Sequence, residues 1–128
     1  MTPRKLQSAL RARALEYPDT EEAFPWGERV IKVKKKVFVY LGDVTRPEEL
    51  RFTVKLPMSG KAALKLPWAK PTGYGLGKSG WVSFAPGTER VELEQIFAWL
   101  DESFRAVAPK TVVAKLGESA SPRAKRTR

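Results

Sequence analysis

The chain has 128 residues, 42% of them hydrophobic, which suits one domain with its own core. It contains neither cysteine nor histidine, so disulfides, thiolate metal sites, a cysteine nucleophile and catalytic machinery built on histidine are excluded. Twenty-four Lys and Arg against 14 Asp and Glu give a formal charge of +10, which indicates either a polyanionic partner such as nucleic acid or a means of staying soluble.

The first predicted element is an amphipathic helix that begins near Thr2 and ends before Pro18. Threonine suits the N-cap position, and Pro3 suits the first helical position. An apolar stripe recurs at spacings of four, four and three residues, formed by Leu6, Leu10, Ala14 and Tyr17. Arg11 is placed on the opposite, solvated face. Residues 19–24 are expected to add one more helical turn, in which acidic side chains cap a helix N-terminus rather than hold a metal.

Three β-strands are predicted next, over residues 29–33, 37–41 and 50–56. Residues 34–36, all lysine, are expected to form the tip of a hairpin between the first two strands. The third strand alternates, with Leu50, Phe52, Val54 and Leu56 pointing one way and Arg51, Thr53 and Lys55 the other. A period of two with one polar face indicates a sheet covered on one side only, whose open face is basic.

The next predicted elements are a short helix over 61–65, a glycine-rich segment, a strand over 81–84 and a long helix over 93–107. The long helix carries a broad apolar stripe, formed by Leu93, Ile96, Phe97, Leu100, Phe104 and Val107. Trp99 lies at the edge of that stripe and is expected to be half exposed.

Two long amphipathic helices and an antiparallel sheet with one polar face predict an α+β domain of two layers, with the sheet packed on the helices. This single domain is expected to span residues 1–109. Residues 110–128 hold six basic residues and one acidic residue, and are expected to form a basic, disordered tail.

Residues 72–81 read TGYGLGKSGW and contain Gly-Lys-Ser, which also ends a phosphate-binding P-loop. A P-loop needs glycine at position 72, where this chain has Thr72. It must also open a helix, whereas a strand is predicted from Trp81 onward. Nucleotide hydrolysis by this segment is therefore disfavoured. The glycines are interpreted instead as a tight hairpin, with Lys78 and Ser79 at its turn.

Three segments carry a wider pattern. The first is Phe24-Pro-Trp-Gly27, followed by Ile31-Lys-Val33, Lys36 and Phe38. The second is LRFTVKLP over residues 50–57, and the third holds Gly73-Tyr74, Leu76, Lys78 and Trp81-Val82, with Ser103-Phe104 later in a helix. In order and spacing these segments resemble the MmcQ/YjbR family of small bacterial proteins, from Leu10 to Lys110. Many members carry a basic residue or histidine before the tryptophan, where this chain has Gly80, so no role is carried over to that position.

The resemblance implies a fold similar to secretion chaperones and to frataxin-like (CyaY-like) proteins, with elements in the order α-β-β-β-α-β-β-α. Members of the family are described as DNA-binding by analogy with a double-wing domain, which is an analogy of fold alone. Frataxin-like iron binding would need an acidic ridge on the first helix, where this chain has mainly arginine and lysine. Iron binding is therefore disfavoured.

The favoured hypothesis is a non-enzymatic protein that binds nucleic acid, DNA in particular, through the basic hairpin and the open sheet face. The side chains expected to contact phosphates are Lys34, Lys35, Lys36, Arg51, Lys55, Lys70 and Lys78. Trp68 and Tyr74 are the aromatic side chains expected to meet an unpaired base. The competing interpretation is structural, since hairpin lysines also prevent edge-to-edge aggregation and aromatic side chains more often anchor the core.

The alternative function is a protein-interaction module, an adaptor like a secretion chaperone, that holds a partner through the open sheet face and Trp99. No constellation of base, nucleophile and oxyanion donor can be assembled, so an enzyme is not expected. Neither a cofactor nor a metal is expected. The chain has no signal-peptide core and no apolar stretch of about 18 residues, so a cytoplasmic protein without a membrane partner is expected. The sequence leaves the oligomeric state open.

Overall fold

The computed structural model describes residues 2–43, 45–46, 50–73, 75–87 and 89–118. Within them, a six-stranded antiparallel sheet has the strand order β1-β2-β3-β4-β6-β5. The strands are β1 (Thr20–Ala23), β2 (Glu28–Val33), β3 (Lys36–Asp43), β4 (Phe52–Lys55), β5 (Ala69–Pro71) and β6 (Trp81–Phe84). The helices are α1 (Pro3–Leu15), α2 (Gly60–Ala63), α3 (Leu93–Val107) and α4 (Lys110–Glu118), with 3₁₀ turns at Pro25–Gly27 and Leu76–Ser79.

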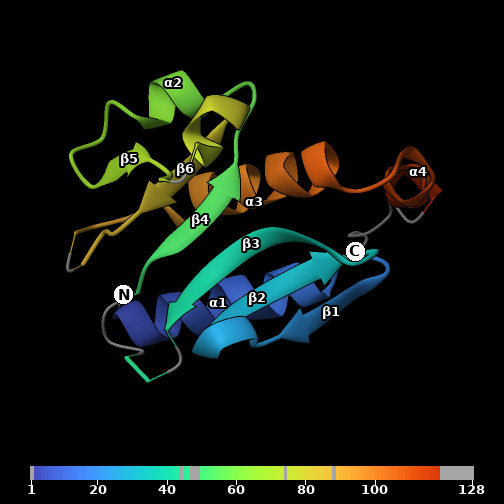
Figure 1. Ribbon diagram of the computed structural model, residues 1–128, viewed down its shortest axis with the longest axis horizontal. Helices are drawn as coiled ribbons and strands as arrows, with labels where there is room; N and C mark the ends of the chain where they lie inside the picture. The colour runs from blue at the N-terminus through green and yellow to red at the C-terminus, as the bar shows by residue number, and fades with distance from the viewer. Residues whose placement is uncertain (1, 44, 47–49, 74, 88, 119–128) are drawn as a thin grey trace.

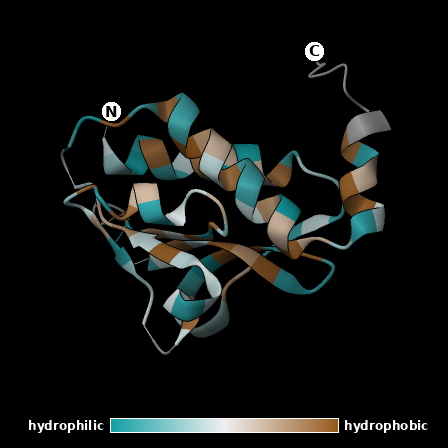
Figure 2. Ribbon diagram, turned by 90° about the horizontal axis from the view of Figure 1, so that it is seen from above, coloured by the Kyte–Doolittle hydropathy of each residue, from teal (hydrophilic) through white to brown (hydrophobic). Residues whose placement is uncertain are grey.

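Helices α1 and α3 cover one face of the sheet, and the other face is left open (Figure 1). Seen at right angles in Figure 2, these helices form one layer above the strands. The predicted α+β class, with an antiparallel sheet packed on helices, is confirmed. The element order differs from the prediction mainly by the addition of β1 and α4. Among the residues that the structure describes, no helix has the length and apolar character needed to cross a membrane.

The core between helices and sheet is rich in aromatic rings. Phe104 of α3 stacks on Tyr17 and meets Phe38 of β3 edge-on, with ring centroids 4.3 and 5.2 Å apart. The prediction that Trp99 is half exposed is wrong, because its side chain is 6% exposed and stacks on Phe84 at 4.6 Å. Strand β6 and the segment before β5 pack over this side of α3 and cover the edge of the apolar stripe.

Residues 20–23 form the edge strand β1, so the predicted extra helical turn is wrong. Glu22 of β1 lies between two arginines. Arg11 of α1 donates from Nε and Nη2 at 2.6 and 2.9 Å, and Arg29 of β2 donates from Nη1. Arg11 is thus tied to the sheet rather than placed on a free solvated face. The ladder with β2 and these charge-assisted hydrogen bonds outweigh the local preference of acidic residues for a helix N-terminus.

The hairpin between β2 and β3 turns at Lys34 and Lys35, within the predicted tip. Both residues have positive φ, 49° and 72°, as in the type I′ turn that Asn-Gly usually supplies. Lysine in that conformation costs about 1–2 kcal/mol of backbone strain. Val33 pairs with Lys36, so β3 begins at Lys36, one residue earlier than predicted.

Strands β3 and β4 pair over a short stretch, through Val39 with Val54 and Tyr40 with Thr53. On either side of these pairs the strands diverge, so the sheet consists of two halves, β1-β2-β3 and β4-β6-β5 (Figure 1). Next to the paired stretch, the buried Ser103 of α3 bridges the two strands through its hydroxyl. The divergence at the opposite end of the pairs makes room for a cavity on the open face.

The glycine-rich segment joins the antiparallel strands β5 and β6, as predicted for a hairpin, and Lys78 and Ser79 lie in a 3₁₀ turn within it. The chain enters and leaves this turn through Gly75 and Gly80, whose φ values are 79° and 93°. Gly77 packs so closely that an added Cβ would lie 2.9 Å from Pro71, which only glycine permits. As predicted, a strand follows rather than the helix that a P-loop requires.

The tail was expected to begin at residue 110, but residues 110–118 form helix α4. Val112 is buried and belongs to the hydrophobic core. Lys115 donates to Asp19 at 2.6 Å and fastens α4 to the loop before β1. The basic composition of residues 110–128 taken together hid this helix, which is held by contacts distant in sequence. Residues 119–128 lie outside the described residues.

Candidate functional site

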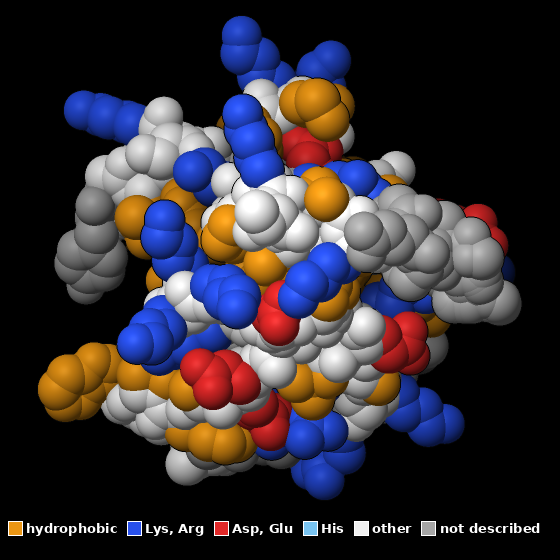
Figure 3. Space-filling view, turned by 90° about the vertical axis from the view of Figure 1, so that its right-hand side faces the viewer, with side chains coloured by type: hydrophobic (Ala, Val, Ile, Leu, Met, Phe, Trp, Pro, Cys, Tyr) orange, Lys and Arg blue, Asp and Glu red, His pale blue; other side chains and the backbone are white. Residues whose placement is uncertain are grey.

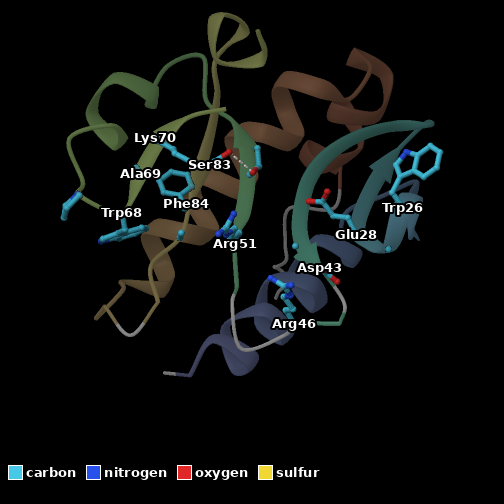
Figure 4. A pocket seen from close by; sticks show the side chains of 15 residues that line it. Trp26, Glu28, Asp43, Arg46, Arg51, Trp68, Ala69, Lys70, Ser83 and Phe84 are labelled. Carbon is cyan, nitrogen blue, oxygen red and sulfur yellow. Dashed lines mark hydrogen bonds between the residues drawn. The ribbon is translucent and has the colours of Figure 1, made fainter. Parts of the chain in front are cut away.

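A cavity of about 800 Å³ opens on the uncovered sheet face, where β3 and β4 diverge. Its two walls come from the two halves of the sheet (Figure 4). The first wall holds Glu28 at the start of β2 and Asp43 at the end of β3. The second wall, here called the hydroxyl wall, holds Arg51, Thr53, Ser83 and Lys70.

The register of the strands places the hydroxyl wall on one face. Thr53 of β4 lies opposite Ser83 of β6, and Ser83 lies opposite Lys70 of β5. Arg51 precedes Thr53 by two residues and therefore shares its face. Thr53 Oγ1 lies 3.0 Å from Ser83 Oγ, which lies 2.9 Å from Thr72 Oγ1. Three hydroxyls thus form a continuous row between an arginine and a lysine.

The two cations of this wall are exposed and unneutralised. Neither Arg51 nor Lys70 forms an ion pair with any residue that the structure describes. Elsewhere in the same part of the chain, several cations are paired, for example Arg11 and Arg29 with Glu22. An anion at this wall would therefore meet positive charge that the protein does not already balance.

The first wall combines the carboxylates of Glu28 and Asp43 with the guanidinium of Arg46, which lies near Asp43, and Glu28 is partly desolvated (Figure 4). Burial raises the pKa of the Glu28 carboxyl, and the neighbouring Asp43 raises it further, although a hydrogen bond from the Gly42 backbone opposes them. Hydrogen bonds from Thr45 lower the pKa of Asp43. Burial also raises the pKa of the Tyr40 phenol, with the charge of Glu28 adding to the effect. The two carboxylates oppose an anion on this wall, and Arg46 offsets part of that repulsion.

Trp26 stands at the rim of the cavity and is fully exposed. It lies in the 3₁₀ turn between Pro25 and Gly27, with φ of 56°, a left-handed conformation that tryptophan rarely adopts. Its neighbour Phe24 is half exposed and lies under the guanidinium of Arg29, 5.1 Å from the ring centroid. Strain at an exposed aromatic residue beside a cavity is typical of a contact site.

The structure brings together three of the residues predicted to bind nucleic acid, namely Arg51, Lys70 and Trp68. Trp68 is only partly available, because its ring packs 5.6 Å from Phe84 and 6.4 Å from Trp99. Most of the Trp68 ring therefore packs against the core, as the structural interpretation expected.

The other predicted residues lie away from the cavity. Lys34, Lys35 and Lys36 sit at the opposite end of the β2–β3 hairpin, where Lys34 approaches Asp19 at 4.0 Å. That side of the molecule carries many Lys and Arg side chains interspersed with Asp and Glu (Figure 3). Lys55 lies opposite Trp81 at the far end of β4, and Lys78 lies in the 3₁₀ turn before β6. Tyr74 lies outside the described residues.

Sequence reasoning did not select Trp26, Glu28, Thr53 or Ser83 as contact residues. For Trp26 a signal was present, since a tryptophan between proline and glycine has no place in a helical or strand pattern. The hydroxyls gave no such signal, because single Ser and Thr residues on strands are ordinary. Only the register of β4, β5 and β6 aligns them.

The YjbR family model matches residues 15–106, so the chain belongs to the YjbR family. The chain is similar to protein DR2400 of Deinococcus radiodurans, which has the domain DUF419, with 27% identity over 91% of both chains and a TM-score of 0.70. A protein from Pseudomonas syringae has the same fold, with 18% identity over 79% of this chain and 97% of that chain and a TM-score of 0.60. No curated protein matches the chain. All the residues that line the cavity fall within the matched region.

Proposed function

We propose that this member of the YjbR family is a non-enzymatic protein that binds nucleic acid, DNA in particular, in the cavity on the open sheet face. The observation that carries the proposal is the pair Arg51 and Lys70, two unneutralised cations that flank the hydroxyl row. Phosphate oxygens are the common ligands of such groups in nucleic-acid complexes. The overall charge of +10 supports the same partner by long-range attraction.

A single strand fits the cavity better than a duplex. The walls are the two halves of one small sheet, and the hydroxyl wall presents its donors on a single face. Trp26 at the rim offers a free aromatic surface on which an unpaired base can stack. The lysines of the hairpin tip, Lys34 to Lys36, together with Lys55 and Lys78, would contact a longer strand that continues past the cavity.

The chemistry of the wall supports binding rather than catalysis. The Ser83 hydroxyl lies within hydrogen-bond distance of two other hydroxyls, those of Thr53 and Thr72, and neither is a base. Glu28 and Asp43 belong to the opposite wall. Within the described part of the chain, no activated nucleophile is assembled next to the cations.

A second candidate, a protein-interaction module, is favoured by a different observation. Phe24 and Trp26 form an exposed aromatic pair on the first half of the sheet, and such side chains often anchor protein partners. Trp99 was expected to belong to this contact surface, but it is buried and cannot contact a partner.

The two candidates respond differently to salt. Fluorescence anisotropy with a labelled single-stranded DNA at about 50 mM salt should detect binding that weakens steeply as salt is raised. An apolar contact between proteins would persist at high salt. Absence of binding at low salt, together with a co-purified protein that remains bound at high salt, would favour the interaction module.

A further inference from the structure

We infer that the hydroxyl wall is a subsite for a terminal phosphate group, so that the protein prefers phosphorylated ends of single strands over the internal backbone. This inference rests on the proposed function and deepens it. The wall consists of Arg51, Thr53, Ser83 and Lys70, with Thr72 completing the hydroxyl row. Its free hydrogen-bond donors and its positive charge suit a phosphate monoester.

One proton of the hydroxyl row is always free. Thr53, Ser83 and Thr72 have one hydroxyl proton each, and the two hydrogen bonds between them use two. The free proton lies on Thr72, Thr53 or Ser83, according to the direction of the row. Thr53 and Ser83 line the cavity, so an anionic oxygen placed there favours the directions that turn a donor towards it. The row can therefore reorient by rotating hydroxyl groups, without moving the backbone.

Two cations reach the same place. Lys70 lies directly opposite Ser83, and cross-strand partners have Cα atoms about 5 Å apart. Arg51 lies just before β4, two residues and about 7 Å from Thr53, and lines the same cavity. Figure 4 shows Arg51, Ser83 and Lys70 on one side of the opening. A group the size of a phosphate above Ser83 is within reach of both long side chains.

The number of donors and the charge suit a monoester better than a diester. A terminal phosphate carries a charge of about −1.5 to −2 at neutral pH and has three acceptor oxygens. The Arg51 guanidinium, the Lys70 ammonium and the free hydroxyl are three donor groups, one for each of the three oxygens. An internal diester carries a single charge and two free oxygens, which leaves one of the cations unneutralised. On the facing wall Glu28 and Asp43 repel either anion, and Arg46 beside Asp43 offsets part of this repulsion.

The test compares one single-stranded DNA sequence in three forms, with a 5′-phosphate, with a 3′-phosphate and with neither. We expect at least one phosphorylated form to bind about tenfold more tightly than the unphosphorylated strand, the effect of one further charge-assisted contact. Inorganic phosphate and a mononucleotide serve as competitors, which distinguishes a phosphate bound alone from a phosphate bound as part of a strand.

Substitutions of cavity residues test whether the terminal phosphate binds at the hydroxyl wall. Arg51→Gln and Lys70→Gln should each remove most of the gain from the terminal phosphate, whereas Lys61→Gln, which replaces an exposed lysine outside the cavity, should leave the gain unchanged. Far-ultraviolet circular dichroism verifies that each variant is folded. Equal affinity for all three strands would overturn the inference while leaving the proposed function in place. A phosphate preference that survives both cavity variants would also overturn it. Binding to none of the strands would overturn both the inference and the proposed function.

Discussion

The hydroxyl of Ser103, on helix α3, donates a hydrogen bond to the backbone carbonyl of Phe38 on strand β3. The same hydroxyl accepts a hydrogen bond of 2.8 Å from the backbone N–H of Lys55 on β4. Ser103 is fully buried, and it joins the two strands just beyond their paired residues. A helix side chain thus takes the place of a backbone hydrogen bond between β3 and β4, where the two halves of the sheet join. The hydroxyl wall belongs to the second of these halves, so its position depends on this junction.

We predict that Ser103→Ala destabilises the fold by about 2–4 kcal/mol, because it leaves two buried strand groups without partners. Thermal or urea denaturation followed by circular dichroism measures the change. The matched control is Ser83→Ala on the open face, where water can replace the lost hydroxyl and the change should stay below about 1 kcal/mol. Equal effects of the two substitutions would contradict the role assigned to Ser103.

Much of the fold was predictable because it follows from local periodicity. The alternation around Val54 identified a sheet with one open face, and the stripe that contains Phe104 identified α3. Strand β1 was not predictable in this way. Its acidic residues resemble a helix start, and it forms because Glu22 meets Arg11 and Arg29, which are distant in sequence. Such tertiary contacts leave no local pattern.

The candidate site was predictable only in part, for a similar reason. Arg51 could be placed on the open face from alternation alone. Its proximity to Lys70 depends on β6 lying between β4 and β5, and this strand order cannot be read from the sequence. The exposure of Trp26 depends on the 3₁₀ turn that precedes β2.

Replacing Trp26 separates stability from binding. In Trp26→Gly the left-handed backbone conformation is no longer strained, so we expect the free energy of unfolding to stay constant or to rise by up to about 1 kcal/mol. Binding of single-stranded DNA should weaken by about tenfold, the value of one base stacked on an aromatic ring. Trp26→Phe, which retains a ring, should keep much of the affinity. A loss of stability in Trp26→Gly would instead give Trp26 a structural role.

The titration of Glu28 gives a prediction for stability against pH. Because the pKa of Glu28 is raised in the folded state, its ionisation opposes folding, and this penalty develops as pH rises through the folded pKa. Glu28→Gln, which retains an oxygen acceptor for the Gly42 backbone, should therefore have a higher Tm than the parent at pH 7 to 8. The difference in Tm should shrink as pH falls from the raised folded pKa towards about 4.5, and should be small below that, where Glu28 is protonated in both states. An increase in Tm that is the same at all pH values would contradict this reading.

Helix α4 contributes to stability, so the effect of shortening the chain depends on whether this helix is kept. A chain that ends at Pro109 loses the buried Val112 and the pair between Lys115 and Asp19, and we expect a loss of about 2–4 kcal/mol. A chain that ends at Glu118 should keep its Tm within a few degrees and retain binding by the cavity. Loss of DNA binding in that longer chain, with the fold intact, would assign the binding to residues 119–128 instead.

The central claim is that the cavity cations contact the phosphates of a nucleic acid. The most direct measurement is the slope of log affinity against log salt concentration for single-stranded DNA. We predict that the double variant Arg51→Gln/Lys70→Gln flattens this slope by about 1.4, since each lost phosphate contact on a single strand removes about 0.7. The matched variant Lys61→Gln/Lys65→Gln removes the same charge outside the cavity and should leave the slope nearly unchanged. Equal slopes for the two double variants would contradict the claim.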